Sequence, residues 1–484
     1  MRKLSTIRTT IAHRGLKKRD KRPEIRTHAL LFRKFTVSAG WGGRSTRHAT
    51  AALVAVALLA GGALTTSAVP LAAQLRYERE YPSIEYSTRT RTDRVAQLRD
   101  RIEGGMVELA FEERGGYLTA LLEQLDISVS SQTLVFTRTS LQARQISPRR
   151  PRAIYFNDDV YVAWVQGSEV IEISAVDPVM GGVFYTLGQD TADAGDFVIE
   201  TGLCLECHDS YGLTGGGAPR HLVGSMLPDA SGRAVYHEGW RLTDDRTPLR
   251  ERWGGWYVTG THGDVTHRGN VIVSSPEDVS GLDFAATGNR EELSDLVDTS
   301  PYLSGHSDIV ALLVLEHQVH VQNEITRLGY DARTSLYHDE VEGRSPAPGD
   351  TRASAETLQV IATVGEGLIR AMLLVDEAPL EANIEGTSGF AEQFELRGVP
   401  DNQGRSLRDL NLRRRLFEYP LSYLIYSRSF DALPGEAKAF VYRRLAELLG
   451  GDDRPEDYAH ISEAQGRAIL DILRDTKPDF PVSR

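Results

Sequence analysis

The only two cysteines of this 484-residue chain lie three positions apart, in the run Cys204-Leu205-Glu206-Cys207-His208. No disulfide can therefore staple the rest of the chain, which must fold on its hydrophobic core. On a helix, residues three and four positions apart share one face, so both thiols and the imidazole can meet the same ligand. The spacing C-x-x-C-H is the attachment sequence of c-type haem, in which two thioethers hold the haem and the histidine binds its iron. The sequence predicts one haem c per chain, bound covalently by Cys204 and Cys207, with His208 as the proximal iron ligand.

Three other interpretations of the cysteine pair are open. A structural zinc site needs four nitrogen or sulfur ligands, and two distant histidines would have to complete it because there is no second cysteine pair. A thioredoxin-like dithiol expects a strand before the motif within a βαβ unit, whereas residues 196–203 (DFVIETGL) have the pattern of a short amphipathic helix. A disulfide between cysteines three residues apart is strained and gives His208 no role. Haem is the interpretation that uses all three side chains.

The N-terminus tests the haem prediction independently, because haem is attached to C-x-x-C-H only after export. Residues 1–48 form a basic extension with fourteen Lys and Arg against Asp20 and Glu24, and residues 49–73 hold an uncharged apolar stretch. The apolar stretch is shorter than the ~20 residues of a full membrane span, which favours a cleaved signal peptide. If it is not cleaved, it anchors the protein with the basic extension on the cytoplasmic side.

We therefore expect a protein that is periplasmic, or membrane-anchored facing the periplasm. The basic extension is longer than an ordinary signal-peptide n-region. Translation from near Val37 would leave an n-region of normal length, and this start is a hypothesis that mass spectrometry of the precursor would test.

The charge of the exported part is strongly acidic. The whole chain carries a net charge of −12 and the first 48 residues carry +12, which leaves −24 on the remainder. This balance argues against nucleic acid as a partner and favours a basic redox partner protein, or simple solubility.

Hydrophobic patterning predicts an α+β fold with a β-containing N-terminal half, a loop-rich haem-binding segment and a helical C-terminal half. Residues 74–190 contain β-branched and aromatic runs separated by turn residues, as in a mostly antiparallel sheet. Residues 191–290 are rich in Gly, His and Trp, and residues 291–484 have amphipathic helical periodicity. The expected strands are 133–137, 153–156, 160–165, 170–174 and 183–187, and the expected C-terminal helices are 307–328, 353–374, 406–417, 436–449 and 462–474.

The sixth position of the iron decides what a haem does, because Met or His ligation is typical of electron carriers and an open site permits peroxide chemistry. The run Trp253 to His267 (WGGWYVTGTHGDVTH) predicts a strand followed by a turn that places His262 between glycines. His262 is therefore the first candidate for the distal ligand, followed by His267 and Met226. An open site is a further alternative. The remaining candidates are Met106, Met180, Met372, His221 and His237.

One face of the long helix expected at 307–328 carries His317, His320 and Glu324, at offsets of three and seven residues. These side chains are spaced to bind a metal such as zinc or iron. A His/Glu stripe is more often a hydrogen-bonded contact between helices, and both interpretations are open.

Several runs resemble a family of large exported bacterial proteins known only as cytochrome c domain-containing proteins. They are YFNDDVYVAWVQG, CLECH, PRHLVGSMLPD, ERWGGWYVTGTHG, SPYLSGHSDIVALLVLEHQ and FEYPLSYLIYSRSFDALP. The similarity extends from about residue 75 to 475, and it implies haem c on Cys204, Cys207 and His208 without an established reaction. The resemblance to compact class I cytochromes c is confined to C-x-x-C-H, because the Met that those domains often carry about sixty residues downstream is missing.

Three functions follow from these predictions. The first is a monohaem c-type cytochrome that transfers electrons between partners. The second is a haem enzyme that acts on peroxide or another small oxidant, although the di-haem cytochrome peroxidases carry two C-x-x-C-H motifs and this chain has one. The third is a non-catalytic haem-containing sensor or binding module.

Overall fold

The structure is a computed structural model that describes residues 78–190, 196–274, 279, 281–349, 351–451 and 454–481. The chain divides into two compact units, residues 1–69 and 70–484, and all described residues belong to the second. The predicted basic extension and the signal peptide or anchor, residues 1–48 and 49–73, lie outside the described residues. None of the described helices has the length and apolarity that a bilayer span requires.

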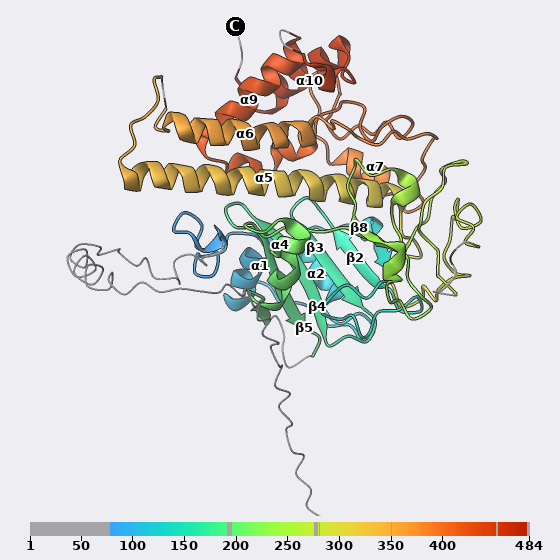
Figure 1. The fold of residues 1–484 in the computed structure, drawn as a ribbon. Helices are drawn as coiled ribbons and strands as arrows, with labels where there is room; N and C mark the ends of the chain where they lie inside the picture. Colours follow the sequence, from blue (N-terminus) through green and yellow to red (C-terminus); the bar gives the residue numbers. More distant parts are fainter. Residues whose placement is uncertain are drawn as a thin grey trace, which may run out of the picture. The chain divides into compact units, whose positions relative to one another are not determined.

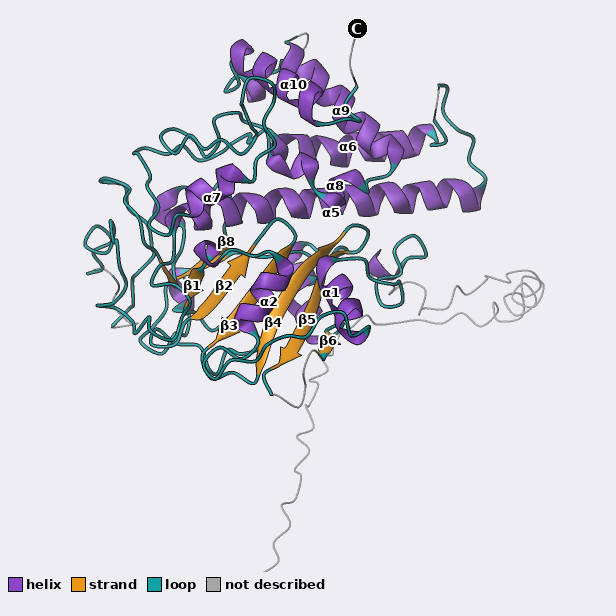
Figure 2. Cartoon of the chain, turned by 180° about the vertical axis from the view of Figure 1, so that it is seen from behind, coloured by secondary structure: helices purple, strands orange, loops and turns teal. Residues whose placement is uncertain are grey.

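A seven-stranded antiparallel sheet forms the first part of the fold, in the order β6-β5-β4-β3-β2-β1-β9 (Figure 2). Local side chains shape its turns. Asn157 and Asp177 each accept hydrogen bonds from the backbone N–H groups two and three residues further on. Gly181 completes the second turn with φ +71°, which glycine adopts without strain. The strands are β1 (Thr133–Val135), β2 (Arg152–Phe156), β3 (Val160–Val165), β4 (Val170–Asp177), β5 (Gly181–Gly188), β6 (Phe197–Ile199) and β9 (Trp256–Tyr257).

The two faces of the sheet have different partners because successive side chains alternate. On β5, Val183, Tyr185 and Leu187 are buried in a core shared with α1 (Arg94–Glu103) and α2 (Leu118–Leu125). Phe184, between them, lies on the opposite face and packs against His208 in the segment after β6. That segment contains α3 (Leu203–His208), α4 (Tyr211–Thr214), β7 (Gly224–Met226) and β8 (Trp240–Leu242).

The 34-residue helix α5 (Ile309–Glu342) runs across one end of the sheet (Figure 1). Gln318 donates a hydrogen bond to the carbonyl of Asn157 in the β2–β3 turn, and Tyr330 donates to the carbonyl of Met180 in the β4–β5 turn. The helix therefore fixes the ends of several strands at once.

Further helices form layers beyond α5, away from the sheet (Figures 1 and 2). The second helix α6 (Ala355–Met372) packs on α5, α9 (Gly435–Gly450) packs on α6, and α10 (Glu463–Thr476) packs on α9. These helices share one hydrophobic core with the adjoining strand ends. The shorter helices are α7 (Phe390–Leu396), α8 (Arg428–Asp431), η2 (Glu78–Glu80), η3 (Val129–Ser131), η5 (Tyr236–Glu238), η6 (Leu249–Glu251), η7 (Tyr423–Tyr426) and η8 (Glu456–Tyr458).

The predicted α+β class is confirmed: the antiparallel sheet lies within residues 133–257 and the chain is mostly helical from residue 309 onward. The expected strands correspond to β1 to β5. Four of the five expected C-terminal helices correspond to α5, α6, α9 and α10, and α5 continues fourteen residues beyond the predicted end at 328.

The prediction of a helix at residues 406–417 is wrong. The structure has turns there, because local side chains satisfy backbone groups that a helix would need. Asn411 accepts hydrogen bonds from the backbone N–H groups two and three residues further on, and Leu412 has φ +53°. A non-glycine residue in that conformation ends any helix.

The helical pattern assigned to residues 196–203 is also wrong. Residues 197–199 form the edge strand β6, in which Phe197 is buried and Val198 is exposed, the alternation of a strand. A strand therefore does precede the cysteine pair. It is antiparallel to β5, so the βαβ unit of a thioredoxin-like dithiol is not formed by it.

Candidate functional site

The C-x-x-C-H motif forms the short helix α3 at the edge of the sheet. Leu205 is buried and anchors this helix in the core that α1 and α2 share. Cys204 is half-buried against the same core, and Cys207 is exposed. The two thiols therefore lie at the boundary between core and solvent, on one turn of helix.

His208 is held by a reciprocal pair of hydrogen bonds to Arg220. Its Nδ1 lies 2.6 Å from the carbonyl oxygen of Arg220, and the N–H of Arg220 donates to the carbonyl of His208 at 2.8 Å. A carbonyl only accepts, so the proton of a neutral imidazole is on Nδ1 and Nε2 keeps a free lone pair. The ring of Phe184, 4.5 Å away between centroids, supports the imidazole from the sheet. Nε2 hydrogen-bonds to no other described residue.

The protonation states at the motif follow from burial. Burial lowers the pKa of His208 below its ordinary value, so the imidazole is neutral at pH 7. Burial, with the carboxylates of Glu200 and Glu172 nearby, raises the pKa of the Cys204 thiol to about 12. A redox-active dithiol needs a lowered thiol pKa. The neutral thioether formed on haem attachment has no such requirement.

Two arginines that interact with His208 each have an unpaired side-chain nitrogen. Arg152 acts on His208 through its charge and Arg220 through its backbone, whereas the guanidinium of Arg220 acts on Asp331. Arg152 on β2 pairs with Glu172 on β4 at 3.1 Å, and both influence the pKa of His208. The Nε atoms of Arg152 and Arg220 are buried and have no hydrogen-bond partner among the described residues. A bound anion near His208 would find the unused Nε–H group of Arg152.

The structure does not bring His262 and His208 together. Nε2 of His262 accepts a hydrogen bond from the backbone of Asn289 at 3.0 Å, and its ring contacts His267 at 4.8 Å. His262 and His267 both follow β9, whereas His208 packs on β5. These two strands are five strand spacings apart in the sheet, or ~24 Å. The other predicted ligand, Met226, lies on β7, where its backbone bonds to Gly254.

A different histidine, His221, shares a neighbour with the motif. Its ring lies 6.1 Å from that of Phe184 and 4.7 Å from that of Tyr161, and its Nε2 is 2.6 Å from the hydroxyl of Ser174. His221 is only 6% exposed. Sequence reasoning placed it among the lesser candidates, because its proximity depends on how the glycine-rich loop after α4 returns to the sheet.

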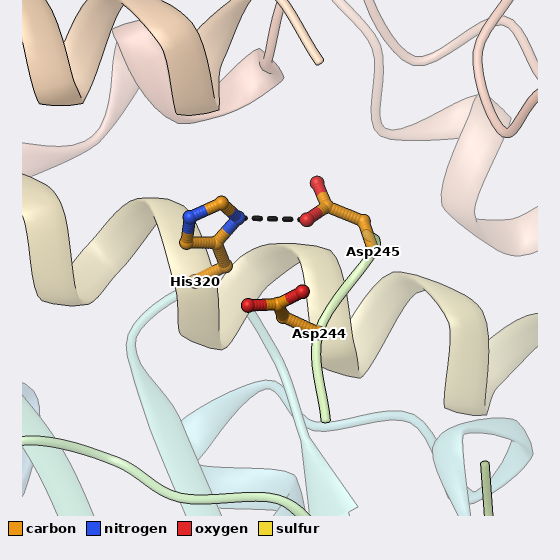
Figure 3. A group of neighbouring side chains, drawn as sticks. All are labelled: Asp244, Asp245 and His320. Carbon is orange, nitrogen blue, oxygen red and sulfur yellow. Dashed lines mark hydrogen bonds and ion pairs between the residues drawn. The ribbon is translucent and has the colours of Figure 1, made fainter. Parts of the chain in front are cut away.

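Two histidines of α5, His317 and His320, contact the carboxylate of Asp245, which the sequence did not predict; Figure 3 shows the contact of His320. Asp245 accepts a hydrogen bond from Nδ1 of His317 on one oxygen and from Nδ1 of His320 on the other, both at 2.7 Å. Nε2 of His317 is 2.9 Å from the hydroxyl of Ser422. The partners of His317 are thus Asp245 and Ser422 rather than Glu324.

The ligand atoms of Asp244, Asp245 and His320 lie within 4.8 Å of one another, close enough to bind a metal ion. Two neighbouring guanidinium groups oppose a cation there. Arg246 pairs with Asp244, and Arg252 donates to the carbonyl of Asp245. Both carboxylate oxygens of Asp245 already have imidazole donors, so the cluster is complete as a hydrogen-bonded network.

Comparison with protein-family models, with curated proteins and with solved structures finds no match to this chain. The chemistry of the site therefore rests on its own residues. Cys204, Cys207 and His208 were identified by their spacing. Arg220 and Phe184 had no local signal, because each reaches His208 through a loop or a neighbouring strand.

Proposed function

We propose that this protein is an exported monohaem c-type cytochrome that transfers electrons through one haem c. In this proposal Cys204 and Cys207 hold the haem covalently and His208 is the proximal iron ligand. The observation that carries the proposal is the hydrogen bond from Nδ1 of His208 to the carbonyl of Arg220. It leaves Nε2 unprotonated and fixes the ring, as a carbonyl or carboxylate opposite the ligand nitrogen does for metal-ligating histidines.

The residues around the motif fit the group. The thiols of Cys204 and Cys207 are free, and their boundary position allows one edge of a bound haem to remain near solvent. The unpaired Nε of Arg152, whose charge acts on His208, suits a carboxylate of a haem propionate. A bound haem supplies a one-electron redox centre.

The protein's own residues set the conditions for that centre. The Arg220 carbonyl orients the imidazole of His208 and raises its basicity, and Phe184 restrains the ring. Burial keeps His208 neutral, which is the form that binds iron. The distal ligand is best sought outside the β9 region, because His262 and His267 are engaged at the far edge of the sheet.

Export and partner choice belong to the same proposal. The sequence before residue 74 supports a periplasmic location or a membrane anchor, and the acidic exported part suits a basic redox partner. Nucleic acid is not a partner in this proposal.

The experiment that tests this function is expression with periplasmic haem maturation, followed by a pyridine haemochrome spectrum. We expect one covalently bound haem per chain. The variant Cys204→Ala should retain at most one thioether and shift the haemochrome band, and His208→Ala should lose normal iron ligation. An unchanged haemochrome spectrum in Cys204→Ala would refute the attachment.

The alternative haem enzyme makes a different prediction for the reduced holoprotein with carbon monoxide. An electron carrier with both axial positions filled keeps a low-spin spectrum when carbon monoxide is added. A fast spectral shift would count against a simple electron carrier and favour the enzyme.

A further inference from the structure

A cavity of about 420 Å³ opens between α2, the β2–β3 turn, α5 and α7. Its floor is aromatic. The ring centroid of Phe390 lies 5.6 Å from that of Phe156 and 5.8 Å from that of Phe394, and the rings of Phe390 and Phe394 are stacked at an interplanar angle of 26°. All three rings are buried and line the cavity. A volume of this size, with flat apolar walls, suits a small planar ligand.

The polar groups of the cavity favour a neutral ligand. Arg397 pairs with Asp126 at 2.9 Å, and Arg408 pairs with Asp158 while lying over the ring of Phe394. Each guanidinium is therefore already balanced by a carboxylate, so an anion gains little from either.

Gln393, which lines the cavity, has an amide whose orientation is fixed. Ser128 and Ser130 both donate to Oε1 of Gln393, which fixes the orientation of that amide. Its Nε2 hydrogen-bonds to no other described residue. An oriented N–H beside an aromatic floor suits the carbonyl oxygen of a planar ring.

The cavity wall is also one end of a chain of ring contacts that reaches the candidate haem ligand. Phe156 stacks on Tyr161 at 6.3 Å, and Tyr161 contacts His221 at 4.7 Å. His221 lies 6.1 Å from Phe184, which contacts His208 at 4.5 Å. Electrons tunnel more efficiently through side chains in direct contact than across gaps. This row of rings therefore gives a shorter tunnelling path to His208 than a path along the surface.

The side chain of Tyr161 takes part in this chain of contacts as a neutral phenol. Burial raises the pKa of its phenol far above the ordinary value, and its oxygen accepts a hydrogen bond from Gln318. The phenol therefore keeps its proton.

We propose that the cavity binds a quinone or its hydroquinone and that the ring chain connects this ligand with His208. The inference rests on the proposed function and names its small-molecule donor. Oxidation of the hydroquinone to the quinone releases two electrons and two protons. The two electrons leave one at a time toward His208, and two molecules of the basic redox partner are each reduced by one of them, while the two protons pass to solvent.

The binding experiment uses the full exported chain and 1,4-naphthoquinone, measured by equilibrium dialysis. Gln393→Trp fills part of the cavity, and Glu392→Trp is the matched control because Glu392 is exposed on the same helix and does not line the cavity. We expect saturable binding to wild type and Glu392→Trp, and at least about tenfold weaker binding to Gln393→Trp. Equal affinity of the two variants, or no saturable binding to wild type, would overturn the proposal.

The connection to His208 is tested by mixing naphthohydroquinone with the oxidised holoprotein and following haem absorbance. Tyr161→Leu removes a ring from the chain without lining the cavity, and Tyr161→Phe keeps the ring. Reduction severalfold slower in Tyr161→Leu than in Tyr161→Phe, at unchanged naphthoquinone affinity, supports the connection. Equal rates would overturn it. Failure of the proposed function can be distinguished from failure of this inference. If the protein binds no haem, the haemochrome spectrum is missing, whereas quinone binding in the dialysis experiment is unaffected.

Discussion

The chemistry of an imidazole depends on the atom that its Nδ1 faces, and His208 differs in this respect from the two histidines of α5 that contact Asp245. Nδ1 of His208 faces a neutral carbonyl, which leaves the ring neutral and Nε2 available. Nδ1 of His317 and Nδ1 of His320 face the Asp245 carboxylate, and this carboxylate raises the pKa of His320. The first arrangement suits a metal ligand and the second a structural ion pair.

Replacing the shared carboxylate should destabilise the fold. Asp245 is buried, and Asp245→Asn places an amide donor against two Nδ1–H groups. We expect the free energy of unfolding to fall by about 3 kcal/mol, because a buried charged network loses one partner. The matched control is Asp244→Asn, whose partly exposed ion pair with Arg246 should contribute no more than about 1 kcal/mol. Urea unfolding of both variants measures the difference, and equal losses would contradict the assignment.

The ion pair also predicts a pH dependence. Asp245 raises the pKa of His320 despite burial and the nearby Arg246, and the two histidines hold the pKa of Asp245 well below its usual range. His320 therefore makes its whole contribution to the free energy of unfolding below its unfolded pKa near 6.5. This contribution is lost as pH rises through the raised pKa of the folded state. The stability from Asp245 is present above its unfolded pKa near 3.8.

We accordingly expect the stability difference between wild type and His320→Gln to be largest between these two pKa values and to shrink above pH 6.5. Urea unfolding at a series of pH values measures it. A difference that grows toward pH 9 would show that Asp245 does not hold the charged imidazole.

At the scale of single residues, the sequence predicted groups of residues that are close in the chain. It did not predict contacts between residues that are far apart in the chain. The haem motif is a run of five residues, and the stripe on α5 follows from helical spacing. Arg220 is 12 positions from His208, and Asp245 is 72 and 75 positions from its two histidines. Such pairs form only when loops return to the sheet or helix, so no periodicity reveals them.

At the scale of elements, periodicity identified the long helices because a buried face repeats over many turns. It failed where side chains bond to their own backbone, as Asn411 does in the region expected to be a helix. It also failed for β6, because a three-residue strand at an edge is too short to distinguish alternation from a helix start.

The start of α5 should depend strongly on its cap. One oxygen of Asp308 accepts from the N–H groups of Val310 and Ala311, and the other accepts from Thr387 and Ser388. Asp308→Ala leaves buried donors unpaired, and we expect a loss of about 2–4 kcal/mol. Ser462→Ala, at the more exposed cap of α10, should cost about 1 kcal/mol. Thermal unfolding of the two variants tests this order, and a larger loss in Ser462→Ala would contradict it.

At the scale of the molecule, α5 joins the two main cores. It crosses the sheet ends on one side and carries the helical layers on the other, so the proposed haem site on the sheet and the cavity beside α7 belong to one packed body. The fold class was predictable because it needs only the order of strands and helices. The way α5 lies across the turns was not, because those contacts link residues such as Gln318 and Asn157, 161 positions apart.

The net charge of residues 49–484, which we propose are exported, predicts how the proposed cytochrome associates with its partner. A charge near −24 attracts a basic redox protein over long range, and added salt screens this attraction over a Debye length of ~8–10 Å. We expect the bimolecular rate of electron exchange with a basic redox protein to fall steeply as ionic strength rises from about 0.01 M to 0.15 M. Exchange with an acidic redox protein of similar potential should rise over the same range, because salt then screens a repulsion. Stopped-flow kinetics measures both rates. If neither rate changes with salt, the partner is met through an uncharged surface and the acidic charge serves solubility alone.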